Sequence, residues 1–320
     1  MALIDVKNVV KKFPIRGGVL NRVTANVHAV TDVSMSIEKG ETVGVVGESG
    51  CGKSTLGKVI IRLLEPTSGT VYYAGKEITG LDHSEMMPFR RKMQIIFQDP
   101  YSSLNPRLTV NALLKEAILF HAIVSRAEVP AYIEKLIALV GLRPDAGAKF
   151  PHEFSGGQRQ RIGIARALAV KPDFVVADEP VSALDVSIQA QVLNLLKDLK
   201  EEFGLTMMFI SHDLKVIEHF CDRVVVMYLG HLVEQLPCER LHQEAQHPYT
   251  KVLLGANPID DPADRRPLAI VKGDVPSPIN PPPGCPFAGR CPLVMERCRH
   301  EMPALEIKAN GRPVACWAVE

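Results

Sequence analysis

The chain has 320 residues, of which 46% are hydrophobic, with seven cysteines and a formal net charge of +1. This length suits one domain of ordinary size with an appendage. The balanced charge excludes the basic surface typical of nucleic-acid-binding proteins and of proteins held on anionic membranes. Because no targeting segment and no apolar run of bilayer length occurs, we expect a cytoplasmic protein that reaches a membrane only by docking onto another polypeptide.

Three strands are predicted near the N-terminal end of the chain. Residues 3–10 and 27–37 show partial alternation of apolar and polar residues, with a turn at Gly17-Gly18 between them. Such short strands predict an antiparallel edge. Residues 42–46 form a continuous apolar run, which is typical of a buried strand.

The next residues fit the pattern G-x-x-x-x-G-K-[ST]. Small residues let consecutive backbone N–H groups turn toward phosphate oxygens, while Lys53 adds a positive charge and the Ser54 hydroxyl is a Mg²⁺ ligand. Residues 55–64 have helical spacing, so a helix N-terminus also points at the phosphates. The order strand, loop, helix predicts a nucleoside triphosphate site made of Gly47, Glu48, Ser49, Gly50, Cys51, Gly52, Lys53, Ser54 and Thr55.

A helical region is predicted between residues 81 and 140, with amphipathic helices over 111–119 and 129–140. Within it, Gln98 follows the strand-like segment 93–97. Its side-chain carbonyl is a candidate ligand for Mg²⁺ or for an attacking water. An ordinary exposed glutamine is the alternative.

A Ser-Gly-Gly turn, Ser155-Gly156-Gly157, opens a predicted helix over residues 158–169. It is a second helix N-terminus suited to an anion, but no second lysine lies nearby. The simplest use of both helix starts is a head-to-tail pair of chains with nucleotide between them. The alternative is a glycine-containing helix cap without a ligand.

Two predicted buried strands end in polar residues, at the edge where parallel sheets place their ligands. Residues 174–177 lead into Asp178 and Glu179, and residues 206–210 lead into His212. Asp178 is expected to hold Mg²⁺, and Glu179 to act as the base on an attacking water. His212 is expected to donate to the γ-phosphate. A solvated acidic pair and a surface histidine are the alternatives.

From Asn257 onward prolines become frequent, so we predict one domain over residues 1–255 and an extension over residues 256–320. The last four cysteines have the spacing C-x5-C-x6-C-x17-C, unlike the C-x2-C pairs of zinc ribbons. In a reducing compartment such a cluster favours metal ligation over disulfides, with four unligated thiols as the alternative.

Together these residues resemble the nucleotide-binding subunit of ABC transporters, over about residues 3–255. The correspondence comprises Walker A (47–55), the Q-loop (Gln98), the signature motif (154–158, including Gln158), Walker B (174–178), the catalytic glutamate (Glu179), the D-loop (182–185, including Asp185) and the switch histidine (His212). The resemblance implies an ATPase that uses ATP and Mg²⁺, with Ser54, Gln98 and Asp178 as metal ligands.

The implied fold is an α/β P-loop NTPase with a RecA-like parallel core, an antiparallel β edge and a helical subdomain at about residues 99–170. A small, irregular, cysteine-rich C-terminal extension is expected to follow it. Phe13 falls where the family places an aromatic residue that stacks on adenine. An insertion from Pro14 to Val27 follows it and affects this alignment. His28 is the fallback.

The tail narrows the resemblance. Residues 246–250 and 276–285 look like those of the oligopeptide and dipeptide importer ATPases, and residues 97–106 resemble the F-type subunit of that group. This implies a heterodimer with a D-type ATPase, two transmembrane permease subunits and a periplasmic or extracellular solute-binding protein. The location implied is the cytoplasmic face of the inner membrane. The resemblance also favours a [4Fe–4S] cluster held by four thiolates, with zinc as the alternative: Cys285, Cys291, Cys298 and Cys316.

Other functions remain open at this point. A nickel chelate, a murein peptide or another small solute is a possible cargo, because cargo is selected by subunits encoded elsewhere. A non-transport ABC protein acting on nucleic acid is the rival from another class. Such proteins usually carry tandem cassettes or long coiled-coil insertions, and this sequence shows neither. A tail that senses redox state and regulates the ATPase is compatible with transport.

Overall fold

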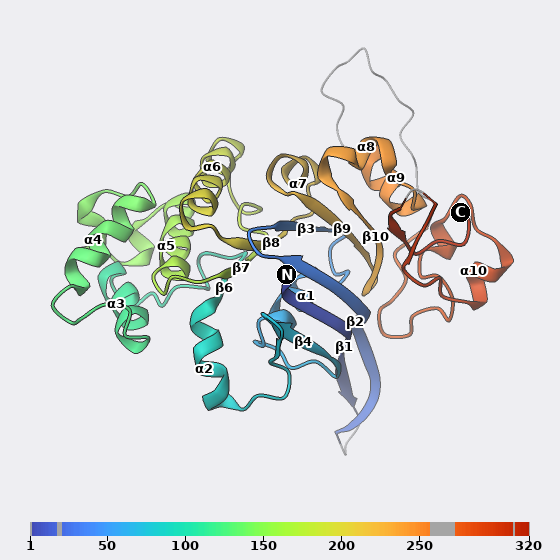
Figure 1. Ribbon diagram of the computed structural model, residues 1–320, viewed down its shortest axis with the longest axis horizontal. Helices are drawn as coiled ribbons and strands as arrows, with labels where there is room; N and C mark the ends of the chain where they lie inside the picture. Colours follow the sequence, from blue (N-terminus) through green and yellow to red (C-terminus); the bar gives the residue numbers. More distant parts are fainter. Residues whose placement is uncertain (1, 18–20, 257–272, 310, 320) are drawn as a thin grey trace, which may run out of the picture. The chain divides into compact units, whose positions relative to one another are not determined.

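The computed structural model describes residues 2–17, 21–256, 273–309 and 311–319 (Figure 1). It divides into two compact units. Unit 1 comprises Met1–Glu38, Thr42–Gly80 and Ser211–Glu320, and unit 2 comprises Lys39–Glu41 and Leu81–Ile210. In the part of the chain that is described, no helix has both the length and the apolar character needed to cross a bilayer.

Unit 1 opens with an antiparallel sheet of strand order β2-β1-β4-β5. Its strands are β1 (Ala2–Gly17), β2 (Arg22–Glu38), β4 (Ser68–Tyr73) and β5 (Lys76–Glu77). The predicted antiparallel edge is confirmed, but its first two strands are longer than predicted. Pro14 pairs with Asn26 and Phe13 with Val27, so most of the expected insertion continues the ladder. Gly18, in the predicted turn, lies outside the described residues.

A second set of strands in unit 1 carries the P-loop. β3 (Thr42–Val46) pairs in parallel with β9 (Arg223–Tyr228), and β9 pairs antiparallel with β10 (His231–Pro237). All five residues of β3 are buried, as predicted. A Cβ on Gly44 would lie 2.6 Å from Ile217 Cγ2, so glycine lets helix α7 (Leu214–Phe220) pack closely on this strand. The helices of this unit up to residue 256 are α1 (Lys53–Ile60), α7 (Leu214–Phe220), α8 (Leu241–Glu244) and α9 (Pro248–Ala256), with a 3-10 turn η3 (Cys238–Arg240).

Unit 2 holds three parallel strands in the order β8-β7-β6. They are β6 (Met93–Ile96), β7 (Phe174–Asp178) and β8 (Thr206–Ile210), and every residue of β7 and β8 is buried. The helices are α2 (His83–Lys92), α3 (Val110–Phe120), α4 (Val129–Leu139), α5 (Gly156–Leu168) and α6 (Val186–Phe203), with 3-10 turns η1 (Pro144–Ala148) and η2 (Pro151–Glu153). The helices predicted over 111–119, 129–140 and 158–169 are thus confirmed to within two residues. In Figure 1, α3 and α4 lie beside α5.

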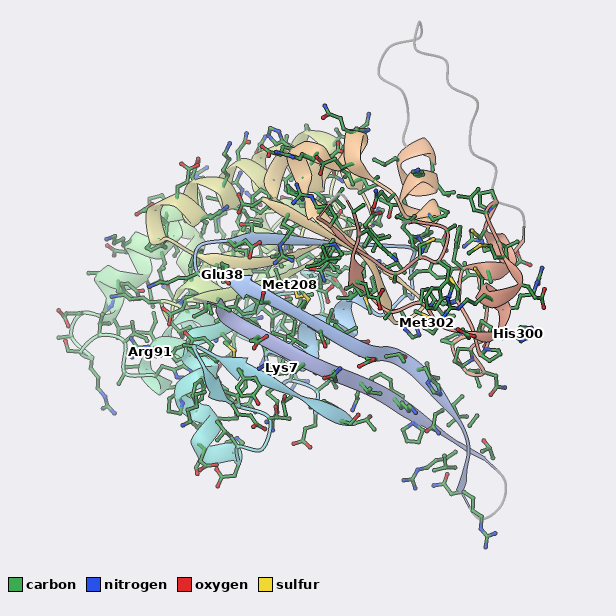
Figure 2. The ribbon with its side chains drawn as sticks, turned by 45° about the vertical axis from the view of Figure 1, so that its right-hand side comes forward. Lys7, Glu38, Arg91, Met208, His300 and Met302 are labelled. Atoms are coloured by element: carbon green, nitrogen blue, oxygen red, sulfur yellow. The ribbon has the colours of Figure 1, made fainter. Side chains whose placement is uncertain are left out.

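The C-terminal extension is more regular than the sequence predicts. Its described part contains η4 (Ala288–Arg290), α10 (Glu296–His300), β11 (Glu306–Ile307) and β12 (Pro313–Val314); residues 257–272 lie outside the described residues. β12 adds to β10 with Val314 opposite Glu234, and Ala315 N–H donates to Val233 O at 2.9 Å. A proline is tolerated here because it is the first residue of a short strand. Figure 2 labels His300, at the end of α10, and Met302 just after it.

Candidate functional site

The loop after β3 has a backbone path that only glycine allows at two positions. Gly47, Gly50 and Gly52 have positive φ angles of 153°, 79° and 104°. A Cβ on Gly47 would lie 2.1 Å from the carbonyl oxygen of Met227, and one on Gly52 would lie 2.0 Å from that of Ala29. Any larger residue therefore forces the loop backbone to move.

Lys53 is buried, with 4% of its surface exposed, and its ammonium group points back into the loop. Nζ donates to the carbonyl oxygens of Gly47 at 2.8 Å and Glu48 at 3.1 Å. Helix α1 begins at this residue, and among the described residues no side chain caps it at Gly52. A buried cation and an uncapped helix N-terminus, with its partial positive charge, together suit phosphate groups. Cys51 beside them is buried, and burial raises the pKa of its thiol, so it is neutral.

In unit 2, the predicted site residues Gln98 and Glu179 lie together at the end of β7. Asp178 is buried at 3% exposure, and Glu179 follows it at the strand end. Gln98 Nε2 donates to Glu179 Oε2 at 3.1 Å, so the amide orients the carboxylate. Glu179 has a φ of 46°, which is strained for a non-glycine residue, and its backbone N–H donates to Ile210 O at 3.0 Å. Strain held in this way is typical of residues at functional sites.

The Ser-Gly-Gly turn is the N-terminus of α5. Ser155 Oγ accepts the N–H of Gln158 at 3.4 Å, and Gln158 Oε1 accepts the N–H of Ser155 at 3.0 Å, which is a capping box. A Cβ on Gly157 would lie 2.4 Å from Ile188 Cγ2 in α6, so this glycine lets the two helices approach. The sequence alternative, a glycine-containing cap, therefore describes the local structure, and a role toward a partner's nucleotide stays a prediction.

The remaining predicted residues have simpler surroundings. Asp185 is the N-cap residue of α6. His212 is exposed directly after Ser211, whose N–H donates to Val45 O at 3.2 Å. Phe13 is half-buried on β1, with Lys11 Nζ 5.0 Å from its ring centroid, and the N–H of His28 donates to Pro278 O at 2.9 Å. The P-loop, Phe13, His28 and His212 belong to unit 1, whereas Gln98, Asp178, Glu179, Asp185 and residues 155–158 belong to unit 2.

The four cysteines of the extension lie near one another. Burial raises the pKa of Cys285 to about 11 and also raises the pKa values of Cys291 and Cys316, and other cysteine thiols are among the groups that raise all three. Three sulfurs accept a backbone N–H from the residue two positions later, as Leu293 N–H does to Cys291 Sγ at 3.3 Å. No group of three or more histidine, cysteine or acidic residues in the described part is arranged to hold a metal ion, so the predicted iron–sulfur or zinc site finds no support there.

The extension also contacts the P-loop, which the sequence did not predict. Arg290 of the extension forms an ion pair with Glu48. Tyr249, in α9 before the extension, accepts the N–H of Glu48 through Oη at 2.8 Å. Tyr249 falls within residues 246–250, whose pattern marks the family but does not show the contact. A lone arginine between two cysteines gives no local signal of a partner 242 residues away.

The chain resembles known proteins over nearly its whole length. Residues 30–182 match the family model described as ABC transporter, and residues 233–298 match that of the oligopeptide/dipeptide transporter, C-terminal region. The probable peptide ABC transporter ATP-binding protein y4tS of Sinorhizobium fredii is 51% identical over 315 residues, which is 98% of this chain and 89% of the relative. The oligopeptide transport ATP-binding protein AppF of Bacillus subtilis is 48% identical over 317 residues, which is 98% of this chain and 96% of the relative.

A solved structure agrees with the fold. The ATP-binding cassette MJ0796, in a dimeric post-hydrolysis state bound to ADP and Pi, matches with a TM-score of 0.64 and 32% identity. The match covers 73% of this chain and 98% of that one.

Proposed function

The chain belongs to the ABC transporter ATPases that carry the oligopeptide/dipeptide C-terminal region, and from this we propose that it hydrolyses ATP to drive peptide import across a membrane. The observation that carries the proposal is the P-loop. Its glycines at positions 47 and 52 leave no room for a side chain, and Lys53 points into the loop. Such a loop wraps its backbone N–H groups around phosphates.

The proposed site residues take different parts in hydrolysis. Lys53 and the N-terminus of α1 bind the phosphates, and Glu179 takes the proton of the attacking water. Gln98, which is hydrogen-bonded to Glu179, keeps that carboxylate oriented, and His212 donates to the γ-phosphate. Support for this division comes from the Gln98–Glu179 contact and from the strained backbone of Glu179.

Mg²⁺ is the metal expected in this reaction, and the donor set has the chemistry it prefers. Ser54, Gln98 and Asp178 supply hydroxyl, amide and carboxylate oxygens. When bound with ATP, the ion neutralises charge on the β- and γ-phosphate oxygens.

Phe13 is proposed to stack on the adenine ring, with His28 as the alternative. Ser155, Gly156, Gly157, Gln158 and Asp185 are proposed to face ATP held by a second ATPase chain.

The partners follow from the family. We propose a heterodimer with a D-type ATPase, on two transmembrane permease subunits that receive cargo from a periplasmic or extracellular solute-binding protein. The chain would then lie at the cytoplasmic face of the inner membrane. The names of its relatives refer to peptide and oligopeptide transport and support a place in a peptide transporter. The dimeric state of the solved cassette supports the pairing of two ATPase chains.

The cysteine group is proposed to hold a [4Fe–4S] cluster through Cys285, Cys291, Cys298 and Cys316. Four thiols are the donor set that such a cluster takes, and N–H groups directed at three of the sulfurs would stabilise cluster thiolates. The described cysteines are not arranged as a metal site, so the proposal rests on the donor type and the resemblance alone. A bound cluster would cross-link four positions of the extension. Anaerobic purification with iron, sulfide and zinc analysis tests this proposal: a colourless protein with zinc alone, or with free thiols, would overturn it.

Uptake by whole cells tests the function. The gene is removed from its host and replaced with the wild type, with Lys53→Ala, or with Lys197→Ala as a control for an exposed lysine. Entry of labelled dipeptides and oligopeptides should be lost on removal, restored by the wild type and Lys197→Ala, and not restored by Lys53→Ala. Unchanged peptide entry, with loss of uptake of a nickel chelate or a murein peptide, would reassign the cargo. Salt-sensitive nucleic-acid binding by the purified chain would favour the non-transport alternative.

A further inference from the structure

We propose that Arg290 of the C-terminal extension is a positioning residue for the nucleotide-binding loop. By holding Glu48, it keeps the first half of the P-loop in the form that receives ATP. The proposal rests on the ATPase activity of the family and does not depend on the transported cargo.

The contact between Arg290 and Glu48 is a two-point ion pair. Nη1 of the guanidinium lies 2.8 Å from Oε2 of the carboxylate, and Nη2 lies 3.0 Å from Oε1. The side chains are 11% and 26% exposed, so water competes weakly for them. A planar guanidinium that meets both oxygens of a carboxylate fixes direction as well as distance, which a lysine ammonium does not.

The arginine is itself held in place by aromatic packing. Tyr228 Oη accepts a hydrogen bond from Nη1 at 3.2 Å. Phe287, three residues before Arg290, is buried against the rings of Tyr228 and Tyr249, with centroids 5.3 and 5.4 Å away. Because Phe287 anchors the 3-10 turn η4, Arg290 reaches the loop from a fixed backbone.

Glu48 is held at both its side chain and its backbone. It lies between Gly47 and Gly50, which have positive φ angles. Because glycine backbones adopt more conformations than those of other residues, these two positions restrain the loop little. Its side chain is held by Arg290 and its backbone N–H is held by Tyr249 Oη at 2.8 Å. This N–H is therefore committed to the fold, and fixing Glu48 limits how the rest of the loop can turn.

A second part of the extension covers the same loop. Residues 275–278 line a cavity of about 260 Å³ together with residues 48–51 of the P-loop and with Tyr228 and Leu229. The carbonyl of Pro278 also accepts the N–H of His28 on β2. Two separate segments of the extension, residues 275–278 and Arg290, thus contact the P-loop or its neighbours. Of these, Arg290 has the positively charged side chain that pairs with the loop.

The expected effect is on nucleotide affinity rather than on the chemical step. Without Arg290, the loop spends only part of its time in the binding form, and the apparent dissociation constant rises by the inverse of that fraction. Loss of a charge-assisted contact of this kind is expected to weaken ATP binding about tenfold. Once ATP is bound, hydrolysis uses other residues, so the maximal rate should stay within about twofold of the wild type.

The test uses the full chain and compares Arg290→Ala, Arg290→Lys and Arg297→Ala. Arg297 is also in the extension and pairs with Glu301 at 2.7 Å, but this pair is exposed. Affinity for a fluorescent ATP analogue and the melting temperature are measured on the chain itself, and KM and kcat are measured in the purified transporter complex. Arg290→Ala should raise Kd and KM about tenfold, Arg290→Lys should recover part of the loss, and Arg297→Ala should change neither.

A double-mutant cycle keeps the proposal testable if Arg290→Ala folds poorly. Glu48→Gln should weaken binding by a similar factor, and adding Arg290→Gln to it should cause little further loss, because both changes break the same contact. Several results would overturn the proposal: losses that multiply, a fall in kcat at unchanged affinity, or a lower melting temperature with wild-type affinity. The last of these would make Arg290 a purely structural residue.

Discussion

Lowering the pH from about 7 to about 5 should weaken the fold by about 2 kcal/mol through His247 alone. His247 is 1% exposed, and burial lowers the pKa of its imidazole to about 4. Nδ1 accepts the N–H of Tyr249 at 3.1 Å, so this nitrogen carries no proton in the fold. A hydrogen bond with the backbone of Ala315, in the extension, only partly offsets the effect of burial.

The fold loses stability on acidification because the pKa of His247 is lower in the fold than in the unfolded chain. The pKa is about 6.5 in an unfolded chain and lower in the fold, so the fold favours the neutral ring. The stability this contributes is fully present above about pH 6.5 and is lost as the pH falls toward 4. At about pH 5 nearly every unfolded His247 is protonated, against about a tenth of the folded ones, which gives the 2 kcal/mol.

Neighbouring groups make a variant comparison necessary. Burial also lowers the pKa of His231 to about 4, so its contribution has the same sign. Glu234, whose carboxylate accepts the N–H of His247 at 3.2 Å, has a pKa raised by burial. The fold therefore binds a proton at Glu234 more readily than the unfolded chain does, and this opposes the effect of His247 as the pH falls.

Urea unfolding of the wild type and of His247→Gln at the two pH values isolates the effect. The wild type should lose about 2 kcal/mol more than His247→Gln between about pH 7 and pH 5. His83→Gln, which changes an exposed histidine of α2, serves as the control and should follow the wild type. Equal pH dependence in the wild type and in His247→Gln would show that His247 does not have a lowered pKa in the fold.

Three further substitutions test the local structure of the site. Gly52→Ala should reduce ATP affinity at least about a hundredfold in a binding titration, because its Cβ would meet the Ala29 carbonyl at a φ that alanine avoids; wild-type affinity would contradict this. Gly163→Ala, inside α5 with open space around its Cβ, should raise the unfolding free energy by about 0.5–1 kcal/mol, and a loss would show a clash the structure lacks. Ser155→Ala removes the cap of Gln158 N–H and should cost about 1 kcal/mol, while ATP binding to the isolated chain stays unchanged.

Local patterns were sufficient to predict the loop and the helices. The glycine spacing and the lysine of the P-loop demand one backbone path, and Ser155 with Gln158 forms the capping box that starts α5. Buried apolar runs placed β3, β7 and β8. These features depend on neighbours in sequence, so the sequence alone was enough.

The rest depended on contacts between distant residues. A two-residue strand such as β12 is too short to show a periodicity of apolar residues. The prolines of the extension predict an irregular tail, yet Val314 pairs with Glu234. The pairing of Pro14 with Asn26 was hidden because weak alternation does not reveal a long hairpin. The contact of Arg290 with Glu48 joins residues 242 positions apart and leaves no trace in local spacing.

The role of Glu179 as the base of an ATPase can be measured with Glu179→Gln in the purified transporter complex. A glutamine oxygen still accepts the hydrogen bond that Gln98 Nε2 donates at 3.1 Å in the wild type, so the change removes the base and keeps the contact. ATP binding should persist while turnover falls by about a hundredfold or more, and Glu201→Gln, an exposed change in α6, should turn over normally. Turnover by Glu179→Gln equal to that of the wild type would contradict the account.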